Sequence, residues 1–171
     1  MKRSPGRPLS GCRLMVGCCL LIGLALGLST ALAAGPDHHY VTRDDFEPDK
    51  CASIWLIKRF VDPQAVFIIH RPGAPLSHGI LFDVPEAKIR RYHNRSTFEY
   101  ILQTWKIDDP KLDYIGKLIH DIEINTWQEK AWPQTLKLQQ DLTGLIEQAA
   151  EADDIIHQSL IYFDTLYRTL D

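Results

Sequence analysis

The densest apolar run beyond residue 34 is Asp49-Lys50-Cys51-Ala52-Ser53-Ile54-Trp55-Leu56-Ile57-Lys58-Arg59-Phe60-Val61-Asp62-Pro63. A helix over this run would be apolar around most of its circumference, which is typical of a buried helix, since a surface helix carries only an apolar stripe. Lys58 and Arg59 would form its one polar edge. Pro63 ends the helix because proline disfavours the α conformation of the residue before it, and Asp49 can cap its first N–H groups. We therefore expect a buried helix around which the other elements pack.

Short apolar runs and capping signals predict the remaining elements. Residues 65–70 and 80–84 are apolar and bounded by prolines, which indicates two strands that could pair across the loop between them. Capping residues and apolar residues spaced three and four apart predict four more helices, over about residues 97–106, 110–124, 133–146 and 152–170. The expected fold class is mainly α, at the margin of α+β: about five helices around the buried first helix, with a small two-stranded β element.

The first 33 residues have the pattern of a secretion signal. Four basic residues precede an uncharged run from Leu14 to Ala34, and Ala31-Leu32-Ala33 fits a signal-peptidase site. Cleavage after Ala33 would leave 138 residues in the periplasm or outside the cell, enough to bury a sizeable core. The alternative is a retained N-terminal membrane anchor, since the uncharged run is long enough to span a bilayer. The expected organisation is a signal peptide over 1–33, an extended arm over 34–48 and one domain over 49–171.

Charge and cysteine content limit the classes of function. The chain has 19 Lys and Arg and 22 Asp and Glu, and the first 33 residues hold four of the basic residues and no acid, so the remainder carries a net charge near −7. This argues against a nucleic-acid surface, which needs clustered Lys and Arg. Cys51 is the only cysteine outside the signal, so the cleaved chain forms no internal disulfide. On a buried helix, Cys51 is expected to be an inert core thiol.

No strong catalytic motif is present: the chain lacks a glycine-rich phosphate loop, Gly-x-Ser-x-Gly and His-Glu-x-x-His. What remains is a set of histidines and carboxylates spread over different predicted helices. Facing helices of bundles use these side chains to hold a divalent metal. The candidate metal ligands are Asp49, His93, Glu99 and Asp121, and His157 and Asp164 are further candidates. Each candidate also has a purely structural explanation that needs no metal; Glu99, for example, has the spacing of a capping box.

Four stretches of the chain resemble the chromate-resistance domain, the C-terminal domain of ChrB-type proteins. The most specific is Asp49-Lys50 with Trp55-Leu-Ile-Lys-Arg-Phe-Val-Asp62-Pro63-Gln-Ala65. The supporting stretches are Phe82-Asp83-Val84-Pro85, His93 ahead of Thr97-Phe98-Glu99, and Tyr162-Phe-Asp164-Thr-Leu166-Tyr167. The resemblance runs from about Asp49 to the C-terminus. Lys50 stands where the family usually has Arg, and Thr97 where Cys is common, so a role for a thiol there is not carried over.

The resemblance implies a role in chromate resistance and favours a polar site at Asp49, His93, Glu99 and Asp121. The resemblance does not extend to the regulatory N-terminal half of ChrB-type proteins, in whose place we expect the signal, so DNA binding is not carried over. We expect a small ion or small-molecule ligand. It would be a divalent metal at the four candidate ligands, or an oxyanion helped by Lys58 and Arg59, because a carboxylate-rich site binds an anion only through a cation. The alternatives are a metal-dependent enzyme and an interaction module without a small ligand.

Overall fold

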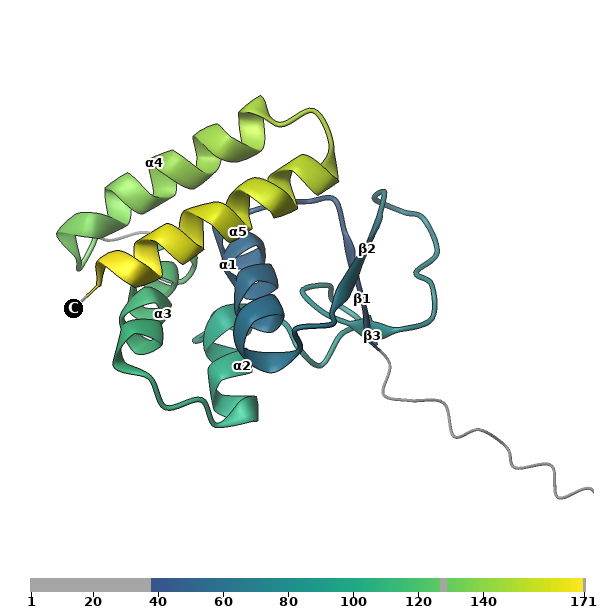
Figure 1. Cartoon of the computed structure of the whole chain (residues 1–171), viewed down its shortest axis with the longest axis horizontal. Helices are drawn as coiled ribbons and strands as arrows, with labels where there is room; N and C mark the ends of the chain where they lie inside the picture. The colour runs from purple at the N-terminus through teal and green to yellow at the C-terminus, as the bar shows by residue number, and fades with distance from the viewer. Residues whose placement is uncertain (1–37, 127–128, 171) are drawn as a thin grey trace, which may run out of the picture. The chain divides into compact units, whose positions relative to one another are not determined.

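The computed structural model describes residues 38–126 and 129–170, and its central element is the predicted buried helix. Helix α1 (Pro48–Leu56) continues into a π-helical turn, η1 (Ile57–Val61), and every residue from Asp49 to Ile57 is buried. In the π turn, the backbone N–H of Asp62 donates to the carbonyl of Ile57, five residues earlier, at 2.8 Å. Figure 1 shows α1 between the long C-terminal helices and the small sheet. The expectation of a buried first helix is confirmed.

The sheet has three parallel strands rather than the expected two. Strand β1 (His39–Arg43) lies in the middle, between β2 (Val66–His70) and β3 (Ile80–Leu81). The expectation that residues 65–70 and 80–84 pair with each other is therefore wrong, because each strand pairs with β1 instead. The arm expected over 34–48 contains this central strand and the first residue of α1. The strand was not predicted because it has only five residues and its two end residues, His39 and Arg43, are polar.

Gly79 allows the chain to enter β3 close to β1. Its φ is +149°, and a Cβ at this position would lie 2.7 Å from the carbonyl oxygen of His39 and 2.6 Å from a methyl group of Val41. Any side chain here would collide with the neighbouring strand, so glycine is required.

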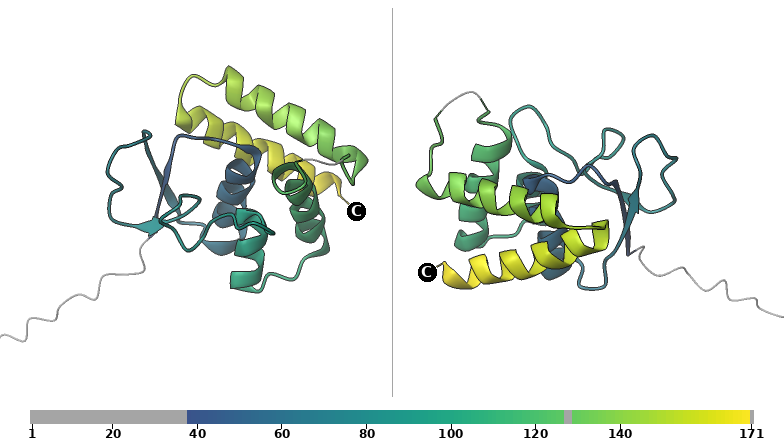
Figure 2. Two further views of the ribbon diagram at one scale, coloured as in Figure 1. Left: turned by 180° about the vertical axis from the view of Figure 1, so that it is seen from behind. Right: turned by 90° about the horizontal axis from the view of Figure 1, so that it is seen from above.

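Four further helices complete the domain, at nearly the residues expected. They are α2 (Thr97–Trp105), α3 (Pro110–Glu123), α4 (Pro133–Gln148) and α5 (Ala152–Thr169). All four pack against α1, and the two views in Figure 2 show α4 and α5 running side by side. Trp55 of α1 stacks on Phe163 of α5 with ring centroids 5.4 Å apart. In the described part of the chain, no helix combines the length and apolar content needed to cross a membrane.

Candidate functional site

Asp49 caps a helix, but not the helix that contains it. Glu47 is the N-cap residue of α1, which places Asp49 inside the first turn. The Asp49 carboxylate accepts hydrogen bonds from the backbone N–H groups of Thr97 at 2.7 Å and Phe98 at 2.9 Å, the first residues of α2. The expectation that Asp49 caps its own helix is therefore wrong. A fully buried carboxylate here ties α1 to α2 and satisfies two N–H groups that have no partner within α2.

Four other acids lie around Asp49 and its neighbour Lys50, and we call the five residues the acid cluster: Asp45, Glu47, Asp49, Asp83 and Glu123. Lys50, whose side chain is 1 % exposed, pairs with Asp45 and lies 3.6 Å from Asp83. Asp83 has a positive φ of 48° and accepts a hydrogen bond from the Thr97 hydroxyl at 2.6 Å. A single lysine therefore bridges two acids of the cluster, and Thr97 links it to the start of α2.

Arg91 is the second cation of the acid cluster. Its Nη2 lies 3.0 Å from Oε1 of Glu47, and its Nη1 pairs with Oε2 of Glu123. Burial, reinforced by Asp83, raises the pKa of Asp49 to about 8. Burial, reinforced by Glu47, raises the pKa of Glu123 to about 7. The five acids outnumber Lys50 and Arg91, so part of the cluster holds protons at neutral pH.

Two hollows adjoin the acid cluster and share Arg90 and Arg91. The first, of about 300 Å³, is lined by Arg90 and Arg91 together with Asp45, Glu47 and Asp83. The second, of about 540 Å³, is lined by Arg90, Arg91, Tyr92, His93, Glu123 and Ile124. The guanidinium of Arg90 lies over the Tyr92 ring, 4.7 Å from its centroid, and forms no ion pair with any residue that the structure describes. We call the second hollow the arginine pocket.

Glu99 and Asp121, the other two predicted ligands, line a separate hollow of about 560 Å³. Glu99 forms the expected capping box with Ser96 and also contacts Nδ1 of His120 at 2.8 Å. Asp121 is 2 % exposed and accepts from Asn125 at 2.7 Å and the Thr135 hydroxyl at 2.7 Å. Burial opposes its ionisation, but these donors lower the pKa of Asp121 to about 2. Asp121 thus stays charged and ties the end of α3 to the start of α4.

The four predicted metal ligands are therefore divided among three places. Asp49 belongs to the acid cluster, exposed His93 lines the arginine pocket, and Glu99 and Asp121 lie in the third hollow. Within residues 38–126 and 129–170, no three His, Cys, Asp or Glu side chains form a group that could hold a metal ion. A single site made of all four is not assembled, and metal binding stays a prediction.

The residues predicted to attract an anion are engaged elsewhere. Lys58 donates to the carbonyl of Ala65 at 2.8 Å. Arg59 forms a two-pronged ion pair with Asp164, at 3.0 and 2.8 Å, and Asp164 also accepts from the indole N–H of Trp55 at 2.8 Å. Asp164 therefore joins α5 to α1. His157, the other further candidate, is exposed on α5.

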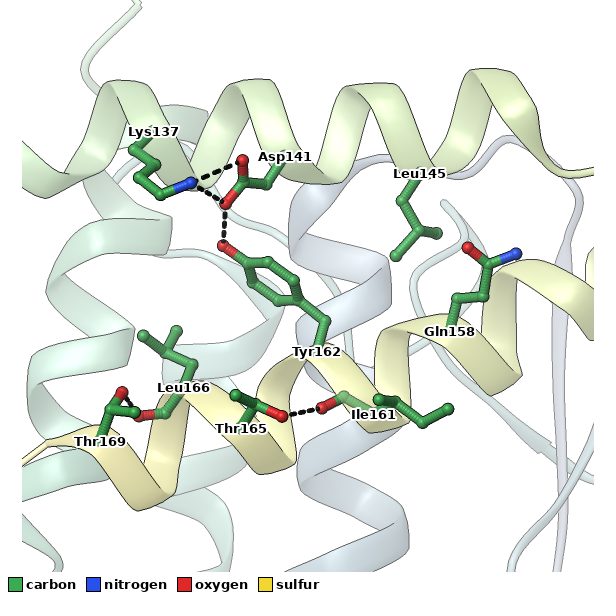
Figure 3. Close-up of a pocket in the computed structure, with 9 residues that line it drawn as sticks. All are labelled: Lys137, Asp141, Leu145, Gln158, Ile161, Tyr162, Thr165, Leu166 and Thr169. Atoms are coloured by element: carbon green, nitrogen blue, oxygen red, sulfur yellow. Dashed lines mark hydrogen bonds and ion pairs between the residues drawn. The ribbon is translucent and has the colours of Figure 1, made fainter.

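Another hollow, of about 510 Å³, lies between α4 and α5 (Figure 3). On its wall Tyr162 of α5 donates to Asp141 of α4 at 2.8 Å, and Lys137 pairs with the same carboxylate. Leu145, Ile161 and Leu166 supply apolar walls. None of the predicted site residues lies here.

The functional candidates missed from the sequence are Arg90, Arg91, Glu47, Asp83 and Glu123. A signal for two of them was visible, because Arg90-Arg91-Tyr92-His93-Asn94-Arg95 is a basic run in an otherwise acidic chain. Nothing local marks Glu123, which comes from the end of α3 and meets Arg91 across 32 residues of sequence.

The described domain is a mainly α protein with a small parallel sheet and a buried acid cluster beside an arginine-lined pocket. Comparison with known proteins places it: residues 40–170 match the family model described as ChrB, C-terminal domain, and the chain belongs to this family. Protein ChrB of Cupriavidus metallidurans strain CH34 is 31 % identical over 87 residues, which are 50 % of this chain and 27 % of that protein. The chain thus matches about a quarter of that curated relative. No solved structure matches.

Proposed function

We propose that this protein contributes to chromate resistance by binding a tetrahedral oxyanion of the chromate class in the arginine pocket. The observation that carries the proposal is the guanidinium of Arg90, which pairs with no carboxylate of residues 38–126 or 129–170 and lines the pocket beside Arg91 and His93. Membership in the ChrB C-terminal domain family supports the connection with chromate.

The chemistry of the lining suits a dianion. Guanidinium groups present several N–H donors in a fixed plane and bind oxyanions with two parallel hydrogen bonds. Glu123 is the one acid in the lining, and it is already paired with Arg91. Because burial raises the pKa of Glu123 to about 7, its negative charge is reduced at neutral pH. The pocket therefore repels an anion less than its composition suggests.

The test is calorimetric titration of the purified protein with chromate, with sulfate as a competitor of similar shape. Arg90→Gln should weaken chromate binding at least about tenfold, since losing a charge-assisted contact of about 1.5–3 kcal/mol has at least that effect. Arg59→Gln is the matched control, because it makes the same change at an arginine that is paired with Asp164, and it should leave the affinity unchanged. Equal effects of the two substitutions, or no binding by the unaltered protein, would contradict the proposal.

A divalent cation, as predicted from the sequence, is a second candidate ligand. Because the described residues form no ready group of three ligands, it would bind one or two carboxylates of the acid cluster and keep waters in its other positions. A bound cation would replace the protons that Asp49 and Glu123 hold and would relieve the repulsion among the five acids. Zn²⁺ or Mn²⁺ should then raise the melting temperature of the protein, and Glu123→Gln should reduce this rise. An unchanged melting temperature with every divalent ion would end this candidate.

The secretion signal predicted over residues 1–33 lies outside the described residues, and export to the periplasm is part of the proposal. Export would place the arginine pocket where chromate meets the cell before uptake. Mass spectrometry of the protein from a periplasmic fraction should give a chain that begins at Ala34. A full-length chain in the membrane fraction would support the retained anchor instead.

A further inference from the structure

The hollow beside Glu99 and Asp121 contains polar groups that no part of the proposed oxyanion site uses. It has a volume of about 560 Å³ and is formed by α2, α3 and the segment that leads into α4. Small-molecule sites typically have volumes in this range, with apolar walls and a few placed polar groups. We call it the His120 hollow.

A carboxylate orients the imidazole of His120. Oε2 of Glu99 accepts from the backbone N–H of Ser96 at 2.9 Å, so the capping box fixes this acid, and Nδ1 of His120 lies 2.8 Å from the same oxygen. A histidine that donates from Nδ1 to a carboxylate leaves Nε2 as a hydrogen-bond acceptor. The side chain of His120 is 38 % exposed, so Nε2 is accessible to a ligand.

Lys117 and Trp132 also line the hollow. Lys117 precedes His120 by three residues on α3, so both side chains lie on one helix face. The Lys117 ammonium lies 5.9 Å from the centroid of the Trp132 ring and makes no ion pair within the described residues. Tyr114 holds the Trp132 ring edge-on at 5.8 Å, so the aromatic wall is fixed in place.

The remaining polar groups of the lining are already engaged. Asn125 donates to Asp121 and to the carbonyl of Glu129, and the Asp121 carboxylate accepts from three donors. Three groups of the lining are left to meet a ligand among the described side chains: Nε2 of His120, which needs a donor, the ammonium of Lys117, which needs an anionic acceptor, and the indole N–H of Trp132. The Trp132 ring and Ile124 offer a wall for a flat apolar body.

We propose that the His120 hollow binds a small aromatic hydroxy acid. The hydroxyl of the ligand donates to Nε2 of His120, its carboxylate accepts from Lys117, and its ring packs against Trp132. Glu99 orients the His120 imidazole and Tyr114 packs against the Trp132 ring before the ligand binds, which reduces the entropy lost on binding. This site shares Ile124 with the arginine pocket, but its polar groups are different residues, and it does not depend on oxyanion binding there.

The experiment is titration of the full chain with 4-hydroxybenzoate, followed by NMR shifts of the indole N–H and imidazole C–H signals. The expected dissociation constant is at or below about 1 mM, a modest affinity for a small ligand. Benzoate lacks the hydroxyl and phenol lacks the carboxylate, so each should bind at least about tenfold more weakly. Chromate at the same concentration should not shift the His120 and Trp132 signals.

Three substitutions with matched controls locate the site. His120→Gln, Lys117→Met and Trp132→Leu should each weaken 4-hydroxybenzoate binding at least about tenfold. His157→Gln and Trp105→Leu should not, although Trp105 and Trp132 are similarly exposed, at 39 % and 37 %. Lys117→Met changes no described hydrogen bond, so it tests the proposal even if the other variants fold poorly. No saturable binding, equal affinity for benzoate, or equal losses in the control variants would overturn the assignment.

Discussion

Asp49 lies in the first turn of α1, yet its carboxylate accepts its hydrogen bonds from the first turn of α2. The distinction matters because a buried cap cannot be replaced by water. Asp109, the N-cap of α3, also accepts two backbone hydrogen bonds, from Lys111 and Leu112, but it is only half-buried. The two acids therefore make the same contact in different surroundings.

Replacing Asp49 should show the difference between a buried and a partly exposed cap. Asp49→Ala should lower the free energy of unfolding by about 2–4 kcal/mol, because it leaves two buried N–H groups without an acceptor. Asp109→Ala should cost about 1–2 kcal/mol, because it removes a partly exposed cap and the hydrogen bond from the Tyr167 hydroxyl. Asp49→Asn keeps one acceptor oxygen, so its loss in free energy of unfolding should lie between the other two. Urea denaturation measures all three, and an Asp49→Ala loss no larger than that of Asp109→Ala would contradict the structural role.

At the scale of elements, strand β1 holds the sheet together. It pairs with β2 on one side and β3 on the other, and those two strands do not pair with each other. Tyr40 and Val41 are buried, at 3 % and 0 % exposure. The segment before α1 is therefore part of the folded domain.

A chain truncated to residues 49–171 should lose cooperative unfolding. It would lack β1, so the backbone groups of β2 and β3 that pair with β1 would lose their hydrogen-bond partners. The buried side chains of Tyr40 and Val41 would also be missing from the core. A chain of residues 38–171 keeps the strand and serves as the control. Circular dichroism during heating should give a sharp transition only for the longer chain. Equal melting temperatures would show that the sheet is dispensable.

At the scale of the whole molecule, the buried acids make stability depend on pH. The pKa of Asp49 is raised to about 8 and that of Glu123 to about 7, and burial raises the pKa of Glu47 as well. In an acid with a raised pKa, the folded state keeps a proton that the unfolded state has lost. The folded state is therefore favoured at low pH, and this stability is lost as pH rises through the folded pKa.

The free energy of unfolding should fall as pH rises from about 4.5 to 8, at up to about 1.4 kcal/mol per pH unit for each buried acid that keeps its proton. Asp121 acts in the opposite direction. Its pKa is lowered to about 2, so the stability that its charged form contributes is lost only as pH falls below about 4. Glu123→Gln should flatten the fall between pH 5 and pH 7, and Glu147→Gln, at an exposed acid of α4, should not. Urea titrations at several pH values give the measurement. Stability that is constant or rises over this range would contradict the role of the buried acids.

Local signals in the sequence predict the helices and most of their ends. Proline at the first helical position, the Ser96–Glu99 capping box and apolar residues at helical spacing are local signals, so they need no knowledge of the rest of the chain. The buried helix over Asp49 to Pro63 was predictable for the same reason, and the same residues carried the family resemblance.

Contacts between residues far apart in the sequence are visible only in the folded structure. The partners of Asp49 are 48 and 49 residues away, Glu123 meets Arg91 across 32 residues, and β1 pairs with strands on both sides. Sequence spacing predicts neighbours within one helix but carries no information on which helix ends come together. The division of the four predicted ligands among three places, and the two pockets proposed as binding sites, follow from the packing of α1 against α2 and α3.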